Sequence, residues 1–233
     1  MRISVIIPAL DEEKYIERCL KSIIRQDLPR ESYEIIVVDG GSRDRTREIA
    51  RRYADKLLLS DKRGIGYQQN IGAEMARGDL LVFVHADTYF IKRRVLRKLL
   101  QYFEDEAVVG GAVSHKYYPE DTLGIKVFNT LDSFLASFFV YLNMPQTGGP
   151  VTVIRKDVFF DIGGFIENIC EDVEIGQRLR EKGRVFRDVE ISAYSSSRRL
   201  EKEGILRNVV KYVLSKLALK LGKNLNIKYP QVR

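Results

Sequence analysis

Short apolar runs alternate with longer segments of helical periodicity along the first hundred residues of this chain. The apolar runs predict strands that are buried on both faces, at residues 4–8, 34–38, 57–59 and 80–84. Apolar residues at helical spacing predict helices over residues 11–25, 42–53, 68–76 and 93–103. Ser42 is expected to cap the second of these helices. Because strands and helices alternate, we expect parallel strands joined by right-handed crossovers.

The pattern changes after residue 103. Strands are predicted at residues 108–114, 151–154 and 190–195, and helices at residues 122–142, 171–181 and 203–221. The predicted fold class is α/β, a single domain over residues 1–200 with a Rossmann-like, mostly parallel central sheet flanked by helices. Its first half, residues 1–103, is expected to bind a nucleotide. Residues 104–200 would form a mixed, acceptor-side extension, and residues 201–233 a basic amphipathic helix and tail.

The net charge of +7 is concentrated near the C-terminus. Residues 198–233 hold ten Lys or Arg and two Glu, hence +8, which leaves −1 for the remaining chain. A general nucleic-acid surface would not be expected to gather its charge in this way, so we expect no nucleic-acid partner. Two cysteines are too few for a disulfide framework, and no run of about 18 apolar residues is present. We expect a cytoplasmic protein, either free or peripheral on the cytoplasmic membrane face.

The predicted final helix has one apolar arc with basic residues on both sides. Lysines beside an apolar stripe suit a helix that lies on an anionic membrane, because their aliphatic stems can snorkel. A helix that docks on the protein core or in a homodimer would show the same pattern. Both interpretations of residues 203–223 stay open. The arc consists of Leu206, Val209, Val210, Val213, Leu214, Leu217 and Leu221.

Candidate metal chemistry follows directly after the strand at residues 80–84. His85 and Asp87, at positions i and i+2, share one face of an extended chain. In an open α/β sheet, ligands lie beyond the carboxyl ends of the strands, and a carboxylate there suggests a divalent metal that carries a phosphorylated substrate. A plain turn is the alternative, since Asp and Thr are common after strands. Asp39, at the end of the second strand, is placed to accept hydrogen bonds from a base or a ribose.

Three further charged segments have both a functional and an ordinary interpretation. Arg63 precedes a helix and could meet a phosphate there, or it is a solvated surface arginine. Glu171 and Asp172 open a helix, where acids are favoured by the dipole, or one of them is a general base for an acceptor hydroxyl. Arg198 and Arg199 are either a second phosphate clamp or part of the basic tail.

The order of these signals resembles the family-2 inverting glycosyltransferases with the GT-A fold, over residues 3–200. Residues 5–13 are similar to the family's strand-Pro-x-x-Asn-Glu-Glu start, and residues 36–42 to its Val-Val-Asp-Asp-Gly-Ser segment. His-Ala-Asp-Thr at residues 85–88, with Ser-Arg-Arg at residues 197–199, looks like a small subgroup of that family. The family's arginine–glycine–asparagine helix pattern is matched by Arg63, Gly64, Asn70, Gly72, Ala76, Gly78 and Asp79.

The resemblance implies metal-dependent, inverting transfer of a sugar from a nucleoside-diphosphate sugar of the UDP or GDP type to an acceptor alcohol, with a polyprenyl-linked alcohol as one option. Asp87 and His85 would ligate Mn²⁺ or Mg²⁺, and Asp172 would be the catalytic base. The acceptor-side residues would be Gln146, Gly148, Gly149 and Glu171. The donor-binding residues would be Pro8, Ala9, Glu12, Asp39, Arg63, Asn70, His85, Ala86, Asp87 and Arg199.

Besides Asp11, which replaces the Asn of the family's start, two residues depart from the family pattern. Gly40 replaces the second acid of the Asp-Asp pair, which would loosen base recognition. His85 replaces the first acid of the Asp-x-Asp motif, and histidine accepts Mn²⁺ better than Mg²⁺. The Gln-x-x-Arg-Trp motif of processive synthases has no full match, so we expect one sugar per encounter. The rival functions are nucleotidyl transfer, which the acidic segment at residues 8–13 disfavours, and a catalytically inactive sugar-nucleotide-binding protein.

Overall fold

The computed structural model describes residues 1–119, 122–141, 149–166 and 171–205, with residues 207, 208, 210 and 214. For residues 132, 133, 135–141, 171–173 and 189 it describes the backbone alone. The strands are β1 Ile3–Ala9, β2 Tyr33–Asp39, β3 Lys56–Leu59, β4 Leu80–Val84, β5 Thr88–Phe90, β6 Val108–Tyr118, β7 Val151–Arg155 and β8 Arg184–Ser196. The helices are α1 Ile16–Ile24, η1 Arg30–Ser32, α2 Thr46–Ala50, α3 Ile65–Glu74, α4 Val95–Tyr102, α5 Leu123–Tyr141, α6 Lys156–Asp161, α7 Glu171–Lys182 and α8 Arg198–Glu203.

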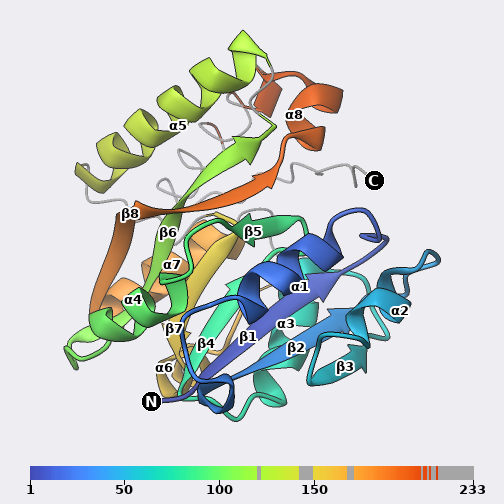
Figure 1. Ribbon diagram of the computed structural model, residues 1–233. Coiled ribbons are helices and arrows are strands. Elements are labelled where there is room, and N and C mark those ends of the chain that lie inside the picture. Colours follow the sequence, from blue (N-terminus) through green and yellow to red (C-terminus); the bar gives the residue numbers. More distant parts are fainter. Residues whose placement is uncertain are drawn as a thin grey trace.

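Within these residues, one eight-stranded sheet runs in the order β3-β2-β1-β4-β7-β6-β8-β5 (Figure 1). The first four strands in this order are parallel, as the alternating pattern predicts. Strand β7 then runs antiparallel to β4, and β6 antiparallel to β7, so that β6 and β8 again point the same way as β4. The predicted mostly parallel α/β sheet is therefore confirmed.

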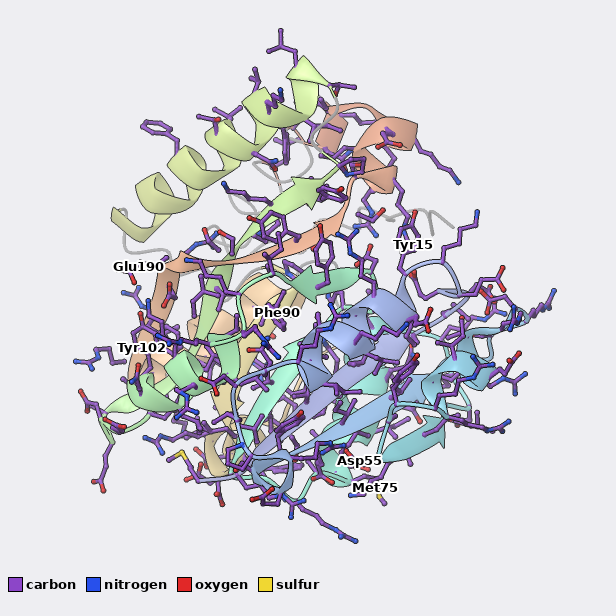
Figure 2. The ribbon with its side chains drawn as sticks, viewed as in Figure 1. Tyr15, Asp55, Met75, Phe90, Tyr102 and Glu190 are labelled. Carbon is purple, nitrogen blue, oxygen red and sulfur yellow. The ribbon has the colours of Figure 1, made fainter. Side chains whose placement is uncertain are left out.

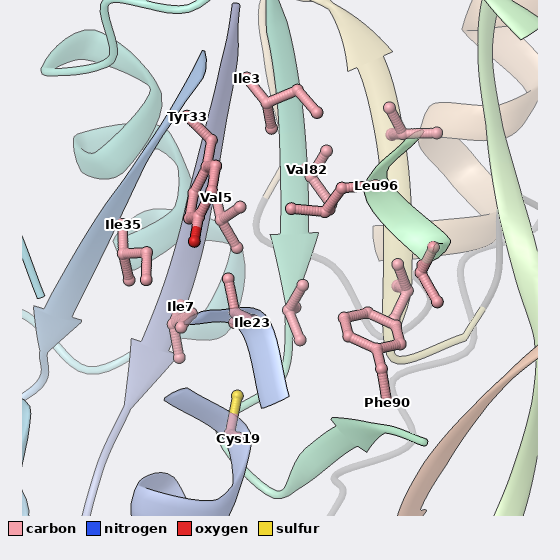
Figure 3. Packing of buried hydrophobic residues seen from close by; sticks show 14 of the residues in the cluster. Ile3, Val5, Ile7, Cys19, Ile23, Tyr33, Ile35, Val82, Phe90 and Leu96 are labelled. Carbon is pink, nitrogen blue, oxygen red and sulfur yellow. The ribbon is translucent and has the colours of Figure 1, made fainter. Parts of the chain in front are cut away.

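The central strands are mainly apolar, and both faces of the sheet are covered. Along β1, Ile3, Val5 and Ile7 point to the face that α1 and α4 cover, whereas Ile6 points to the face that α3, α6 and α7 cover. Figure 3 shows the first of these clusters, where Ile23 of α1 and Leu96 of α4 pack against β1 and β4. Such two-sided burial is typical of parallel strands and explains why their apolar runs do not alternate with polar residues.

Several elements differ from the prediction in their bounds. The helix predicted from residue 11 begins only at Ile16, because Asp11 has a φ of 54° and the backbone NH groups of Tyr15 and Ile16 bond back to the Glu12 carbonyl. Ser42 does not cap α2; the backbone NH of Thr46 binds Asp44 Oδ1 instead, at 2.9 Å. Strand β5 and helix α6 were not predicted, since three and six residues are too short for a clear period.

The ends of β6 and β8, with β5 paired to β8, extend beyond the other strands, and α5 lies over them (Figure 1). Asn129 of α5 binds the backbone of Tyr117 in β6 through both amide atoms, at 2.8 and 3.1 Å. This arrangement accounts for the mixed second half that the sequence predicts, although β6 and β8 are longer than expected.

The tail begins with α8 rather than with a helix at residue 203. Gly204 has a φ of 81°, which interrupts the helix, and its backbone NH caps Leu200 O at 3.0 Å. Val210 and Leu214, from the apolar arc, are 47% and 48% exposed. No helix in the described part of the chain has the length and apolar character needed to cross a bilayer. Most of residues 203–223 lies outside the described residues, so the choice between membrane and protein contact stays a prediction.

Helix α3 lies very close to the sheet at Gly72. A Cβ atom added there would lie 2.4 Å from Ile6 Cγ2 and 3.2 Å from Val38 Cγ2. Both are β-branched side chains in the buried core, so they have little rotamer freedom with which to move away.

We expect Gly72→Ala to destabilise the protein. Helix propensity alone favours alanine by about 1 kcal/mol, but overpacking a core costs about 1–3 kcal/mol, so the net change should be a loss. Urea denaturation measures it, with Glu74→Ala on the exposed side of α3 as the control, expected within about 0.5 kcal/mol of the wild type. A higher urea midpoint for Gly72→Ala would contradict this account of the helix–sheet contact.

Candidate active site

Three chain segments leave the same edge of the sheet and carry most of the predicted site. β1 lies between β2 and β4, all parallel, with Ala9 opposite Asp39 and Ile6 opposite Phe83 in the register. The residues that follow β1, β2 and β4 therefore meet at the carboxyl edge of the sheet. These are the segments at residues 9–13, 39–46 and 85–87, and ligands bind at such an edge in open α/β folds.

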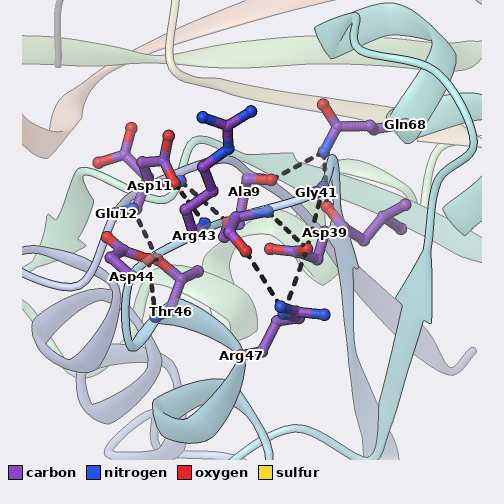
Figure 4. A network of polar contacts seen from close by, with 12 residues as sticks. Ala9, Asp11, Glu12, Asp39, Gly41, Arg43, Asp44, Thr46, Arg47 and Gln68 are labelled. Atoms are coloured by element: carbon purple, nitrogen blue, oxygen red, sulfur yellow. Dashed lines mark hydrogen bonds and ion pairs between the residues drawn. The ribbon is translucent and has the colours of Figure 1, made fainter.

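Asp39 is a completely buried carboxylate at the end of β2. Its Oδ2 accepts hydrogen bonds from the backbone NH groups of Gly41 and Ser42, both at 3.0 Å, and lies 3.8 Å from Arg47 Nε (Figure 4). Its Oδ1 is buried and has no hydrogen-bond partner among the described residues. A buried charged oxygen without a partner is costly, so this atom is suited to accept a hydrogen bond from a ligand.

Gln68 of α3 is a site residue that the sequence analysis missed. Its side chain is 3% exposed, and its Nε2 donates to the carbonyls of Ala9 and Val38, at 3.0 and 2.7 Å, which joins the ends of β1 and β2 (Figure 4). A Cβ atom on Gly40 would lie 3.1 Å from Gln68 Oε1. Gly40, the departure from the family's Asp-Asp pair, thus leaves room for this amide.

The loops after β1 and β2 hold each other in place. The backbone NH groups of Asp11 and Glu12 donate to Ser42 Oγ and Thr46 Oγ1, at 2.9 and 2.7 Å, and the NH of Arg43 donates to Asp11 Oδ1 at 2.7 Å (Figure 4). These bonds hold Asp11 at its positive φ and turn the Glu12 carboxylate toward the third segment. Ser42 and Thr46 therefore position the site.

Arg198 connects the first and third segments. Its Nη1 donates to Glu12 Oε2 at 2.8 Å, its Nη2 donates to Glu12 Oε1 and lies 3.3 Å from Asp87 Oδ2, and its guanidinium stacks over Tyr15 with 4.8 Å to the ring centroid. Tyr15 lies just before α1 (Figure 2). Burial raises the pKa of the Glu12 carboxyl, and the hydrogen bond from Arg198 and its charge only partly offset this effect. The sequence analysis named Arg198 and Arg199 as a possible clamp and Arg199 as donor-binding; Arg199 is exposed, and donor binding by it stays a prediction.

His85 and Asp87 lie where the sequence analysis expected them, directly after β4. Both are half-buried, and the His85 backbone NH donates to the Pro150 carbonyl at 3.0 Å. Among the described residues, no three His, Cys, Asp or Glu side chains are grouped so that they could hold a metal ion by themselves. One carboxylate and one imidazole nevertheless fit Mn²⁺ or Mg²⁺ when diphosphate oxygens and water complete the shell. The charge of Arg198 beside Asp87 shows that this point of the site favours a cation.

Asn70 and Arg63 have different surroundings from those expected of donor-binding residues. The Asn70 amide binds the backbone of Phe165 through both atoms, at 2.8 and 2.9 Å, so Asn70 holds the loop that precedes α7. Arg63 is exposed in the loop before α3. Donor binding by either residue stays a prediction, as it does for Pro8 and Ala9, which belong to β1.

The acceptor-side residues are only partly described. Gly149 has a φ of 135°, and a Cβ atom there would lie 3.4 Å from His115 Nδ1. Gln146 and Gly148 lie outside the described residues. Glu171 and the predicted base Asp172 are the first residues of α7, and their side chains also lie outside the described part.

The topology nevertheless places the start of α7 at the same edge as the site. β8 begins beside the start of β6, with Arg184 opposite Val108, and β6 has the direction of β4. Helix α7 ends directly before β8, at the edge where the parallel strands begin. Its twelve residues therefore start near the opposite, carboxyl edge, and this is where Asp172 lies. Ile175 and Leu179 pack in the cluster around Phe83 of β4, which ends just before His85.

Arg178 fixes α7 to the preceding loop. Its side chain pairs with Glu174 and donates to the carbonyls of Ile162 and Gly164, the latter at 2.8 Å. The loop is in turn held by Asn70 through Phe165. The backbone that carries Asp172 is therefore anchored to the same helix, α3, that supplies Gln68.

Comparison with known proteins gives a consistent result. The family model "Glycosyl transferase family 2" matches residues 4–163. The chain is 28% identical over 191 residues to the glycosyltransferase AglE of Haloferax volcanii. This alignment covers 78% of this chain and 62% of that protein. It is 37% identical over 98 residues to the poly(ribitol-phosphate) beta-N-acetylglucosaminyltransferase TarS of Staphylococcus aureus. This alignment covers 40% of this chain and 17% of that protein. The match thus spans less than two thirds of either relative.

Solved structures show the same fold at low identity. A mannosyltransferase from Pyrobaculum calidifontis, in complex with GDP-Man and Mn²⁺, superposes with a TM-score of 0.67 at 20% identity, over 91% of this chain and 64% of that one. Glucosyl-3-phosphoglycerate synthase from Mycobacterium tuberculosis, in complex with Mn²⁺, UDP and glucosyl-3-phosphoglycerate, superposes with a TM-score of 0.66 at 21% identity, over 97% of this chain and 81% of that one. These likenesses confirm the predicted fold.

Proposed function

The chain belongs to glycosyl transferase family 2, and from this premise we propose that it transfers a sugar from a nucleoside-diphosphate sugar to an acceptor hydroxyl, with inversion and with the help of a divalent metal. The observation that carries the proposal is the buried Oδ1 of Asp39 at the carboxyl edge of the sheet, which has no hydrogen-bond partner within the described part of the chain. An imino NH of a nucleobase is a donor of the kind this atom needs. The fold neighbours that bind UDP or GDP-Man support this choice of donor.

The diphosphate would lie toward Asp87 and Arg198. Negative charge grows on the leaving diphosphate as the bond to the anomeric carbon breaks, and a metal held by Asp87 and His85 would supply two positive charges against it. At 4 Å and an effective dielectric of 20, each unit charge pair contributes about 4 kcal/mol. Arg198, already between Glu12 and Asp87, would hold a diphosphate oxygen with its fork of donors once ligand enters.

Asp172 would take the proton of the acceptor hydroxyl. Its place at the carboxyl edge, at the start of an anchored helix, suits attack on the sugar from the face opposite the diphosphate. In-line displacement of this kind inverts the anomeric centre. The acceptor would be an alcohol, with a lipid-linked alcohol as one option because of the basic, apolar arc after residue 203.

A donor screen tests the function. We expect a UDP- or GDP-sugar to raise the melting temperature in the presence of Mn²⁺, since a ligand at 100 times its Kd stabilises by about 2.7 kcal/mol. Transfer would release a nucleoside diphosphate, whereas nucleotidyl transfer would release pyrophosphate. Stabilisation without any release of nucleoside diphosphate would favour the inactive binding protein.

Asp39→Asn should weaken nucleotide binding by about 10–100-fold. The substitution removes the charge of the carboxylate and replaces one of its two acceptor oxygens by an NH2 donor. Calorimetry with the nucleotide found in the screen measures this loss. The control is Asp157→Asn, an exposed acid at the opposite edge of the sheet, after β7. Equal nucleotide affinity for the Asp39 variant and this control would remove Asp39 from base recognition.

A further inference from the structure

We propose that a cavity between the end of α1 and the start of α4 is a second anion site, which binds a phosphate group. The cavity has a volume of about 620 Å³ and lies between residues 25–29 and residues 93–97. It is separate from the donor site, because α1 begins just after Glu12 and ends just before Arg25. Nine helical residues at about 1.5 Å each put roughly 13 Å between the two places.

The walls of this arginine cavity are joined by hydrogen bonds. The Asp27 NH donates to the Arg93 carbonyl at 2.6 Å, and Arg93 Nε donates to the Arg25 carbonyl at 3.1 Å. Gln26, 6% exposed, accepts from the backbone NH of Leu96 at 3.2 Å and donates to two carbonyls. The cavity is thus a defined part of the fold, and a neutral amide caps the first turn of α4.

Four arginine residues line the cavity, Arg25, Arg93, Arg94 and Arg97, against a single acidic residue, Asp27. Asp27 is already engaged: Arg97 lies 3.4 Å from its Oδ1 and binds its carbonyl at 2.7 and 3.0 Å. The guanidinium groups of Arg25 and Arg94 make no hydrogen bond or ion pair with any described residue. The lining therefore has a net charge of +3, and two of its cations have no protein partner in the described chain.

This charge lies at an unusual place for cations. Arg94 is the N-cap residue of α4, and the first turn of α4 holds no acidic residue. The amino end of a helix is the positive end of its dipole, which attracts acidic side chains and repels cations. Three arginines in or next to that turn oppose the dipole and one another, and a bound anion would relieve both effects.

A phosphate group is the anion that fits this lining best. Guanidinium forks bind the oxygens of phosphate with paired hydrogen bonds, and Arg25 and Arg94 belong to the two segments that form opposite walls. The volume is that of a small-molecule site. The lining offers no aromatic ring for a base or a sugar, and only Leu28 and Pro29 are apolar, so the charged group itself would be recognised. Its source would be a soluble phosphate compound or a phospholipid headgroup.

Titration of the full chain with inorganic pyrophosphate, in EDTA to remove metal, tests the site. We expect Arg25→Ala/Arg94→Ala to bind at least about tenfold more weakly than the wild type, since two charge-assisted contacts are lost. Arg51→Ala/Arg77→Ala is the matched control: both arginines are exposed, and their loss changes the net charge equally, so it should bind like the wild type. Because Arg198 would also hold a diphosphate in the donor site, the titration is repeated with Arg198→Ala in the background, where the loss caused by Arg25→Ala/Arg94→Ala should persist.

Two results would overturn the assignment. One is an unchanged pyrophosphate affinity in Arg25→Ala/Arg94→Ala. The other is pyrophosphate binding that is lost in Arg198→Ala and kept in Arg25→Ala/Arg94→Ala. Flotation with vesicles of phosphatidylcholine, with and without phosphatidylglycerol, then identifies the source. Recruitment to the anionic vesicles that requires Arg25 and Arg94 indicates a lipid headgroup. Pyrophosphate binding that requires them, without such recruitment, indicates a soluble phosphate compound. Circular dichroism checks that the variants fold, which the exposed positions of Arg25, Arg94, Arg51 and Arg77 favour.

Discussion

Asp172→Asn is expected to reduce sugar transfer by about 10²-fold or more while donor binding stays at the wild-type level. Asparagine has nearly the same shape as aspartate but cannot take a proton from the acceptor hydroxyl. A residue that acts only on the acceptor proton should lower kcat and leave the affinity for the nucleotide sugar unchanged. Steady-state transfer rates and donor calorimetry, measured on the same preparation, separate these two effects.

Glu181→Gln provides the control for Asp172. Glu181 is an exposed acid near the other end of α7, so it changes the charge of the same helix away from the proposed site. Its variant should turn over normally. Near-normal turnover by Asp172→Asn, or an equal loss in both variants, would exclude Asp172 as the base and would point to another group at the carboxyl edge.

Asp87→Asn is expected to abolish the metal-dependent part of donor binding. Its carboxylate is the charged oxygen donor that follows β4, and an amide is a much weaker ligand for Mn²⁺ or Mg²⁺. Without the metal, the diphosphate would face the Glu12 carboxylate, whose charge Arg198 already offsets, and would lose the two positive charges that the metal supplies. Calorimetric titration of donor, with Mn²⁺ and with EDTA, should therefore give a metal effect in the wild type and none in the variant.

Asp79→Asn is the matched control, because Asp79 lies directly before β4, at the opposite end of the same strand, where its Oδ2 accepts from the Arg2 NH. It should retain the full metal effect. An unchanged metal effect in Asp87→Asn would show that other residues hold the metal. Loss of the metal effect in both variants would indicate a general defect of β4.

The parts of the site that could be predicted are those carried by strand ends. Continuous apolar runs identify β1, β2 and β4, and the residue after a parallel strand must lie at its carboxyl edge. Asp39 and Asp87 follow from this rule, and the resemblance to the glycosyltransferase family assigned their roles. Asp172 could be proposed only through the resemblance, since two acids at a helix start are ordinary.

Gln68 and Arg198 could not have been chosen with confidence from sequence patterns. A glutamine within a helix carries no signal until the helix is placed across the ends of β1 and β2. Arg198 and Arg199 are chemically identical neighbours, and only the direction in which α8 leaves β8 turns the first toward Glu12. The arginine cavity escaped notice for the same reason, because its two walls are separated by more than sixty residues.

The chain's own order of residues was enough to establish the α/β class, the parallel first half and the edge at which ligands bind. These depend on periodicity and on strand direction, which are local properties of the chain. Three features emerged only from the packed molecule. Arg198 is the arginine that bridges Glu12 and Asp87, and Asp39 Oδ1 is the oxygen that has no partner among the residues described. Arginines also gather at the start of α4. Each depends on contacts between segments far apart in sequence, whose geometry is set by how helices pack on the sheet.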